Sequence, residues 1–190
     1  MAGAVATGFI GKRRFSGQPI GQDDRKRGLR GFDAGKKVKG RKRFLVVDTL
    51  GLPIAIQIEP ASVQERDGGP PIIAEAKRRD PRLSLVWGDS GFAGKCVGIV
   101  RDQSGITLEV VKRPNEGDTK RWAPDGTIPE LETPAFKVLP WRWVVERTFG
   151  WLGRYRRLAK DYEATVESSL AWIHIAFIRL LIQRFGEETI

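Results

Sequence analysis

Cysteine and histidine are almost absent from this chain, which has one of each, Cys96 and His174. A single cysteine excludes an internal disulfide and a zinc site made of several cysteines, and it is typical of a protein from a reducing cytoplasm. A single histidine leaves little material for a catalytic triad or a histidine-rich metal site. The longest apolar stretch, residues 170–182, is interrupted by His174 and Arg179, so no membrane span is predicted.

Acidic residues are scarce at the N-terminal end. Residues 1–43 contain 13 Lys/Arg and 3 Asp/Glu, a net charge of +10, whereas the rest of the chain contains 20 of each and is neutral. The positive charge therefore belongs to a basic arm. A cationic arm neutralises phosphates, so this pattern favours nucleic-acid binding. The alternative is a solvated tail without a partner.

A length of 190 residues with 41% hydrophobic residues predicts either one folded domain or one domain plus a tail. Residues 43–48 and 53–59 predict a β-hairpin around Gly51. Beyond it, apolar periodicity and the positions of glycine and proline predict the other elements. These are helices at 64–79, 92–103, 141–160 and 166–185, strands at 83–87 and 106–111, and a loop or insertion at 114–135.

This order predicts an α/β fold in which a mixed sheet is flanked by helices. An RNase H-like fold has the same order but begins with one more strand than the sequence indicates. Residues 1–30 are rich in glycine and basic residues and have no periodicity, so we expect a poorly ordered segment there. Residues 31–190 are then the folded domain.

Asp89 is the first candidate site residue. It lies where a buried strand ends, between Gly88 and Gly91, at the edge where open α/β sheets place ligands. A carboxylate there suits a hard divalent cation. The alternative is an Asp that only caps a turn or a short helix.

Glu146 is the second candidate. It lies in a tryptophan-rich helix, and Arg142, four residues earlier, shares its face. Neighbouring arginines at 147, 154, 156 and 157 suit phosphates. The alternative is a surface ion pair between Arg142 and Glu146 that contributes little energy.

Three stretches in order along residues 30–185 carry a resemblance. They are Gly-Lys-Lys-Val-Lys-Gly-Arg-Lys-Arg at 35–43 with Val-Val-Asp-Thr-Leu-Gly at 46–51, Trp-Gly-Asp-Ser-Gly-Phe-Ala-Gly at 87–94, and Arg-Trp-Val-Val-Glu-Arg-Thr-Phe at 142–149 with Arg-Arg-Leu at 156–158 and Asp-Tyr-Glu at 161–163. Together they resemble the DDE transposases of the insertion-sequence-five type. The third stretch is the most specific.

The resemblance implies roles for particular residues. Asp89 and Glu146 would be catalytic, metal-binding carboxylates, and Arg142 would be the arginine of the family's Tyr-Arg-Glu-Lys signature. The signature's Tyr and Lys positions fall on Leu139 and Gly153, and Arg154 would supply the missing charge. The expected DNA-binding residues are Lys36, Lys37, Lys39, Arg41, Lys42, Arg43, Arg147, Arg154, Arg156 and Arg157.

The family's first Asp has no counterpart. The family carries it in a strand with the motif Asp-Ser-Gln-Ser, where this chain has Gly-Gln-Pro-Ile-Gly-Gln-Asp-Asp-Arg-Lys-Arg at 17–27. One permitted coding of that stretch, read from the second base, gives Asp-Ser-Gln-Ser-Val-Lys-Thr-Thr-Glu-Ser. We therefore hypothesise that residues 1 to about 28 are translated out of frame. The first catalytic strand would then be missing, and residues 1–30 would hold no packed strand.

The implied parent activity is metal-dependent DNA cleavage and strand transfer in insertion-sequence transposition, with two Mg²⁺ or Mn²⁺ ions. Without the first Asp, we expect this chain to be inactive alone. The implied partners are transposon-end and target DNA, and a second copy or an upstream frame product, in the bacterial cytoplasm at the nucleoid. A non-catalytic DNA-binding protein derived from a transposase is the main alternative, and an unrelated nuclease is another. Metal-dependent nicking of DNA would distinguish the transposase from the non-catalytic DNA-binding protein.

Overall fold

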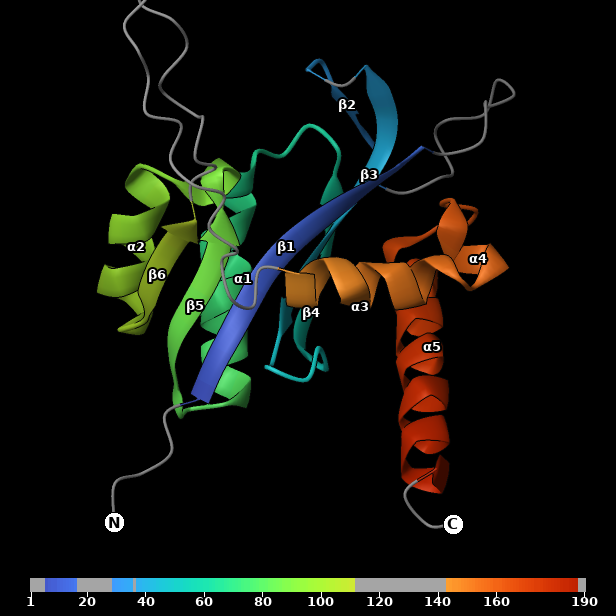
Figure 1. The fold of residues 1–190 in the computed structure, drawn as a ribbon. Helices are drawn as coiled ribbons and strands as arrows, with labels where there is room; N and C mark the ends of the chain where they lie inside the picture. Colours follow the sequence, from blue (N-terminus) through green and yellow to red (C-terminus); the bar gives the residue numbers. More distant parts are fainter. Residues whose placement is uncertain (1–5, 17–28, 36, 112–142, 188–190) are drawn as a thin grey trace, which may run out of the picture.

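A six-stranded mixed sheet with helices on both faces forms the molecule (Figure 1). The computed structural model describes residues 6–16, 29–35, 37–111 and 143–187. In this part of the chain the strands are β1 (Ala6–Ser16), β2 (Gly31–Asp33), β3 (Val38–Val47), β4 (Pro53–Pro60), β5 (Leu83–Asp89) and β6 (Thr107–Val111).

The sheet is antiparallel in one half and parallel in the other. Its path is β2-β3-β1-β5-β6, and β4 also pairs with β3. β3 is antiparallel to β1, β2 and β4, whereas β5 is parallel to β1 and to β6. β1 therefore lies at the centre, where the antiparallel half meets the parallel half.

The position of β1 corrects two expectations from the sequence, namely that residues 1–30 hold no packed strand and that the sheet lacks its central strand. β1 fills the place between β3 and β5, and its Ile10 is buried. The backbone N–H and C=O groups of β3 and β5 need hydrogen-bond partners from the strand between them. This requirement does not depend on the side chains of that strand. Gly8 and Gly11 interrupt the apolar alternation of this segment, so periodicity does not indicate a strand.

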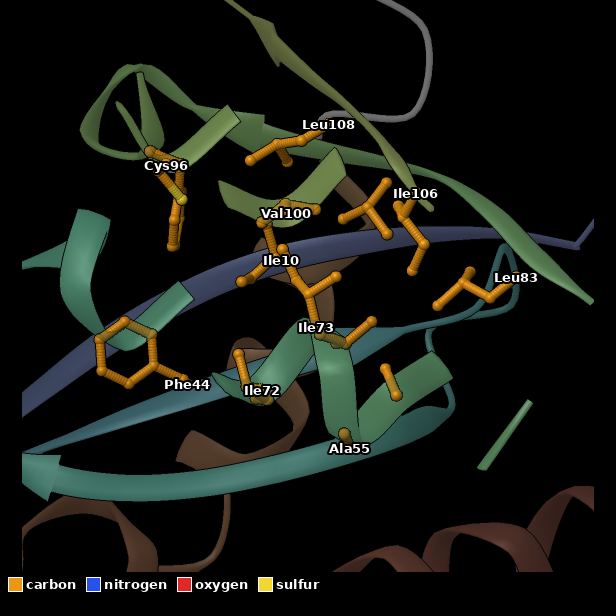
Figure 2. Packing of buried hydrophobic residues seen from close by; sticks show 14 residues of the cluster. Ile10, Phe44, Ala55, Ile72, Ile73, Leu83, Cys96, Val100, Ile106 and Leu108 are labelled. Atoms are coloured by element: carbon orange, nitrogen blue, oxygen red, sulfur yellow. The ribbon is translucent and has the colours of Figure 1, made fainter. Parts of the chain in front are cut away.

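Helices α1 (Glu65–Arg79) and α2 (Lys95–Ser104) cover one face of the sheet. Their residues Ile72, Ile73, Cys96 and Val100 pack with Ile10 and other strand residues in the first core cluster. Figure 2 shows these side chains converging between the two helices and the strands. The short 3-10 helix η2 (Ser90–Phe92) follows β5 and adds Phe92 to this cluster.

Two adjacent glycines let α1 approach the sheet closely. A Cβ atom at Gly68 would lie 2.5 Å from Cζ of Phe44, and one at Gly69 would lie 2.9 Å from Cδ1 of Phe92. The rings of Phe44 and Phe92 meet edge to face with centroids 6.4 Å apart. Only glycine fits between this aromatic pair and the helix, which explains why α1 tolerates two residues of low helix propensity.

Helices α3 (Trp143–Gly153), α4 (Arg156–Ala159) and α5 (Val166–Glu187) cover the other face. Val144, Phe149 and Ile173 pack there against Leu45 and Val47 of β3. Phe44 and Val46, which alternate with these two, point into the first cluster. The sheet is therefore the middle of three layers, and β3 contributes side chains to both cores.

Most elements predicted from the sequence are confirmed. The hairpin is β3 and β4, the helix at 64–79 is α1, and the strand and helix on either side of η2 are β5 and α2. The helix predicted at 141–160 is divided into α3 and α4 around Arg154 and Tyr155. The loop predicted at 114–135 lies outside the described residues.

α5 is long and apolar enough to cross a membrane, by its length and composition alone. The window Val166–Arg184 has a mean hydropathy of 1.3. A core helix of a soluble protein can meet the same criterion, and α5 places Ile173, Ala176 and Phe177 in the second core cluster. Its opposite side exposes Ile175, Ile178 and Ile182.

Candidate functional site

Asp89 is the last residue of β5 and also caps the following turn. Its Oδ1 atom accepts a hydrogen bond from the backbone N–H of Gly91 at 2.9 Å, which makes it the N-cap of η2. The capping role that the sequence left open is therefore present. The same residue is half-buried at the carboxyl edge of a parallel strand, so capping and a site role do not exclude each other.

The strand register places Asp89 just beyond the paired part of β1 and β5. The last pair of these parallel strands is Phe9 with Trp87, and Gly11 and Asp89 each lie two residues further along their own strands. Trp87 packs against the second core cluster, and side chains alternate along a strand. Asp89 therefore lies on the face of the sheet that α3 covers.

α3 crosses β1 directly over Gly11. A Cβ atom at Gly11 would lie 2.5 Å from Cγ2 of Val145, so the helix contacts the backbone of the strand. Glu146 is the next residue of α3 and is exposed to solvent. The structure thus brings the helical turn that carries Glu146 to the same face of the sheet as Asp89, although the two residues are 57 positions apart in the sequence.

The turn between β3 and β4 makes a second set of contacts with α3. Oγ1 of Thr148 donates to the backbone oxygen of Gly51 at 2.9 Å, and an Nη atom of Arg147 donates to that of Leu50 at 2.9 Å. The turn itself is held by Asp48, whose Oδ1 accepts from the N–H groups of Leu50 and Leu52. α3 is therefore clamped on both sides of Glu146, which limits how far this carboxylate can move.

A row of alternating aromatic and guanidinium groups extends from this helix. The guanidinium of Arg147 lies 4.3 Å from the ring centroid of Trp143 and 4.8 Å from that of Trp151. Arg184 of α5 lies 4.3 Å from the centroid of Trp151. Burial, together with the charge of Arg184, lowers the pKa of Arg147, and Asp48 opposes this shift. Two cations near one tryptophan favour binding of an anion.

The carboxylates in the described residues do not form a complete two-ion site. No group of three or more His, Cys, Asp or Glu residues lies close enough to hold a metal within residues 6–16, 29–35, 37–111 and 143–187. β1, the strand between β3 and Asp89, contains no acidic residue. Asp89 and Glu146 are thus two candidate ligands without a third, and two metal ions need more carboxylate oxygens than this pair offers.

Three of the expected DNA-binding residues are buried, which corrects that expectation for Arg41, Lys42 and Arg43. Arg41 forms two hydrogen bonds with Asp161, at 2.5 and 2.8 Å, and Arg43 donates to the backbone oxygen of Leu158 at 2.9 Å. Nζ of Lys42 donates to the backbone oxygen of Val63. These cations are bound to acceptors of the protein itself and do not reach a surface where DNA could contact them.

The other expected DNA-binding residues lie on the surface or outside the described part. Lys37 and Lys39 at the β2–β3 turn are exposed, as are Arg154 and Arg156 at the α3–α4 junction. Arg157 is half-exposed and binds Glu163 at 2.7 Å, and Arg147 is half-buried as described above. Lys36 and Arg142 lie outside the described residues.

Sequence reasoning missed two residues of this region. Thr148 anchors α3 to the β3–β4 turn, and Arg184 joins the row of aromatic and guanidinium groups. Thr148 is buried within an apolar helix, which is a signal that the sequence pattern could have supplied. Arg184 is 33 residues beyond Trp151, and no local pattern links two residues so far apart. Cys96 is buried in the first core cluster, on the other face of the sheet from α3, and burial raises the pKa of its thiol to about 11.

Comparison with known proteins indicates the family of this chain. The family model described as "Transposase DDE domain" matches residues 12–181. A curated relative from Burkholderia cepacia, described as "Putative transposase for insertion sequence element IS402", is 27% identical over 148 residues. That alignment covers 74% of this chain and 60% of the relative, so the chain spans about three fifths of the relative's length. Proteins of this family generally use divalent metal ions and act on DNA. With the family match extending over most of its length, the chain belongs to the transposase DDE domain family.

Proposed function

We propose that this chain is a catalytic-domain portion of an insertion-sequence transposase of the insertion-sequence-five type, with an RNase H-like sheet. The strand path supports the fold assignment. Three antiparallel strands, β4, β3 and β1, are followed by the parallel strands β5 and β6, and helices cover both faces. The sequence motifs around Asp89 and Glu146 support the subgroup.

Asp89 and Glu146 are the proposed metal-binding carboxylates. The observation that carries this assignment is the contact between Val145 and Gly11, because it brings the turn of Glu146 to the sheet face of Asp89. In the parent enzyme, Mg²⁺ or Mn²⁺ would activate a water or a DNA 3′-hydroxyl and stabilise the leaving oxygen. Arg142, just before α3, would contact the phosphate being cleaved.

The described residues supply no third carboxylate to this pair, and this would determine what the chain does alone. β1 occupies the central position of the sheet next to β5 but contains no acidic residue. The chain would therefore bind DNA without cleaving it, or cleave it only slowly. This is also the behaviour of a non-catalytic DNA-binding protein derived from a transposase, which remains the second candidate function.

DNA binding would depend on two exposed basic groups. One comprises Lys37 and Lys39, with Lys36 between Gly35 and Lys37 in the sequence, and the other comprises Arg154, Arg156 and Arg157 with Arg147. Such contacts reach phosphates and carry little sequence information. The proposed ligands are transposon ends and target DNA, and two copies of the chain would hold the two ends.

Nicking of supercoiled DNA tests the catalytic assignment. The chain is compared with a frame-restored version, in which residues 1 to about 28 are translated in the neighbouring frame and the stretch now at 17–27 reads Asp-Ser-Gln-Ser-Val-Lys-Thr-Thr-Glu-Ser. We expect Mg²⁺- or Mn²⁺-dependent nicking only from the frame-restored protein. In that background, Asp89→Asn and Glu146→Gln should abolish nicking, whereas Glu167→Gln, a solvent-exposed change on α5, should not.

Two results would overturn parts of the proposal. Full nicking by the unaltered chain would show that no third carboxylate is needed. Absence of nicking by the frame-restored protein, despite normal folding and DNA binding, would favour the non-catalytic function. The codons of residues 17–27 provide a separate test, because the frame-shift hypothesis fails if the neighbouring frame does not encode the Asp-Ser-Gln-Ser motif.

A further inference from the structure

A cavity of about 240 Å³ lies between α4 and α5, away from Asp89 and Glu146. Tyr155, at the start of α4, and Trp172 of α5 provide aromatic walls, and Ile175 adds an apolar side chain. Arg156, Arg157 and Arg179 also line it, and none of its lining residues is acidic. Aromatic walls with cations and no carboxylate suit a ligand that is planar, apolar on its faces and negatively charged nearby.

The two aromatic rings are held in place rather than free to collapse into the cavity. The hydroxyl of Tyr155 donates to the backbone oxygen of Ala176 at 3.2 Å, which fixes the ring against α5. The guanidinium of Arg157 lies 4.8 Å from the ring centroid of Trp172 and is itself bound to Glu163. Both rings also pack against the second core cluster. The walls of the cavity are therefore largely formed before any ligand binds.

The cationic groups differ in how free they are to bind an anion. Arg157 already binds Glu163, whereas Arg156 is exposed, and Arg179 lies 5.9 Å from the ring centroid of Tyr155. An arginine that reaches from the surface over an aromatic ring can contact a phosphate while the ring contacts a base. Proteins that bind single-stranded nucleic acid combine stacking aromatic side chains with a cationic path for the backbone in this way.

We propose that this cavity binds an unpaired nucleotide of DNA, with the base against Trp172 or Tyr155 and the flanking phosphates on Arg156 and Arg179. The cavity is smaller than the roughly 300 Å³ at which pockets for drug-sized ligands begin, so it accommodates one base. A base inside an intact duplex cannot enter it, which makes the site selective for single-stranded or frayed DNA ends. This inference rests on the proposed function as a DNA-acting transposase domain and names the DNA form that it engages.

Binding of fluorescently labelled oligothymidine and of a duplex of the same length, measured by anisotropy at one salt concentration, tests the proposal. Trp172→Leu keeps an apolar side chain but removes the stacking surface, and should weaken oligothymidine binding about tenfold with a much smaller effect on duplex binding. Trp172→Phe should retain most of the affinity. Ile99→Ala removes an exposed apolar side chain on α2, which covers the other face of the sheet from α4 and α5, and is the control.

Arg179→Gln provides a second variant that does not depend on the core, because Arg179 is exposed. It should also weaken oligothymidine binding more than duplex binding. Equal weakening of both DNA forms by Trp172→Leu and Arg179→Gln, or no change in either, would overturn the nucleotide site. If the unaltered chain binds neither DNA form, the proposed function fails as well. Duplex binding without any effect of the cavity variants on oligothymidine rejects the cavity alone.

Discussion

Arg41 of β3 and Asp161, just after α4, form a fully buried pair that joins the sheet to the C-terminal helices. Their two hydrogen bonds measure 2.5 and 2.8 Å, and each side chain is 2% exposed. An Nη atom of Arg41 also donates to the backbone oxygen of Glu163. The two residues are 120 positions apart, so this pair connects the basic stretch near the N-terminus with the segment between α4 and α5.

Removing Arg41 should destabilise the fold strongly. Arg41→Met leaves Asp161 buried without its cation, and breaking a buried ion pair costs about 3–5 kcal/mol. Urea denaturation measures the decrease in the free energy of unfolding. Lys37→Met, an exposed change in the same basic stretch, should alter stability little. The double variant Arg41→Met/Asp161→Leu should recover part of the stability, and a double variant no more stable than Arg41→Met would contradict this account.

Glu163 should make stability depend on pH. Burial opposes ionisation of this carboxyl, but hydrogen bonds from Arg157 and Ser168 and the charges of Arg157 and Arg41 lower its pKa overall. Because the folded-state pKa lies below that of the unfolded chain, the ionised group stabilises the fold above the unfolded pKa. That contribution is lost as the pH falls through the folded pKa.

Denaturation midpoints of the unaltered chain and of Glu163→Gln, measured from neutral to acidic pH, check this dependence. The variant should be less stable at neutral pH, and the difference should shrink as the pH falls. Glu75→Gln affects only surface pairs with Arg78 and Arg79 on α1 and should change the profile much less. A constant difference between the unaltered chain and Glu163→Gln at every pH would show that the charge of Glu163 does not contribute.

Gly11→Ala should destabilise the packing of β1 against α3. The added Cβ would lie 2.5 Å from Cγ2 of Val145, and overpacking of this kind costs about 1–3 kcal/mol. Val145→Ala in the same chain should relieve the clash, so the double variant should be more stable than the sum of the two single changes implies. Gly98→Ala on α2 meets no atom within 4 Å and should be neutral or stabilising. Strict additivity would show that β1 and α3 do not touch at this point.

DNA affinity should depend on salt through the exposed basic residues only. Deleting residues 1–43 cannot test this, because it would remove β1 and part of β3 from the sheet. The variants Lys37→Gln/Lys39→Gln and Arg154→Gln/Arg156→Gln should each reduce the slope of log affinity against log salt, by about 0.9 for each phosphate that the variant no longer neutralises. Arg101→Gln, an exposed change on α2, should leave the slope unchanged. An unchanged slope in one double variant would exclude that group of residues from the DNA surface.

The sequence by itself determined most of the helices and strands and both candidate carboxylates. The hairpin, α1, β5 and α5 were predictable because their side chains alternate with the period of a strand or a helix. Asp89 and Glu146 were recognisable because each lies in a motif with an unusual local composition. All of these signals are local, because each can be recognised from a short stretch of the sequence.

Only the tertiary structure decided which residues meet. β1 could not be predicted because its place depends on two neighbouring strands that need a backbone partner, and not on its own side-chain pattern. The basic residues Arg41, Lys42 and Arg43 are predicted to bind DNA because charge in a sequence usually indicates a surface. Their burial depends on Asp161, on Leu158 and on Val63, acceptors that the fold brings in from elsewhere in the chain. A charged side chain can be buried only where the fold supplies a partner that offsets the cost of its desolvation. No local sequence pattern contains that information.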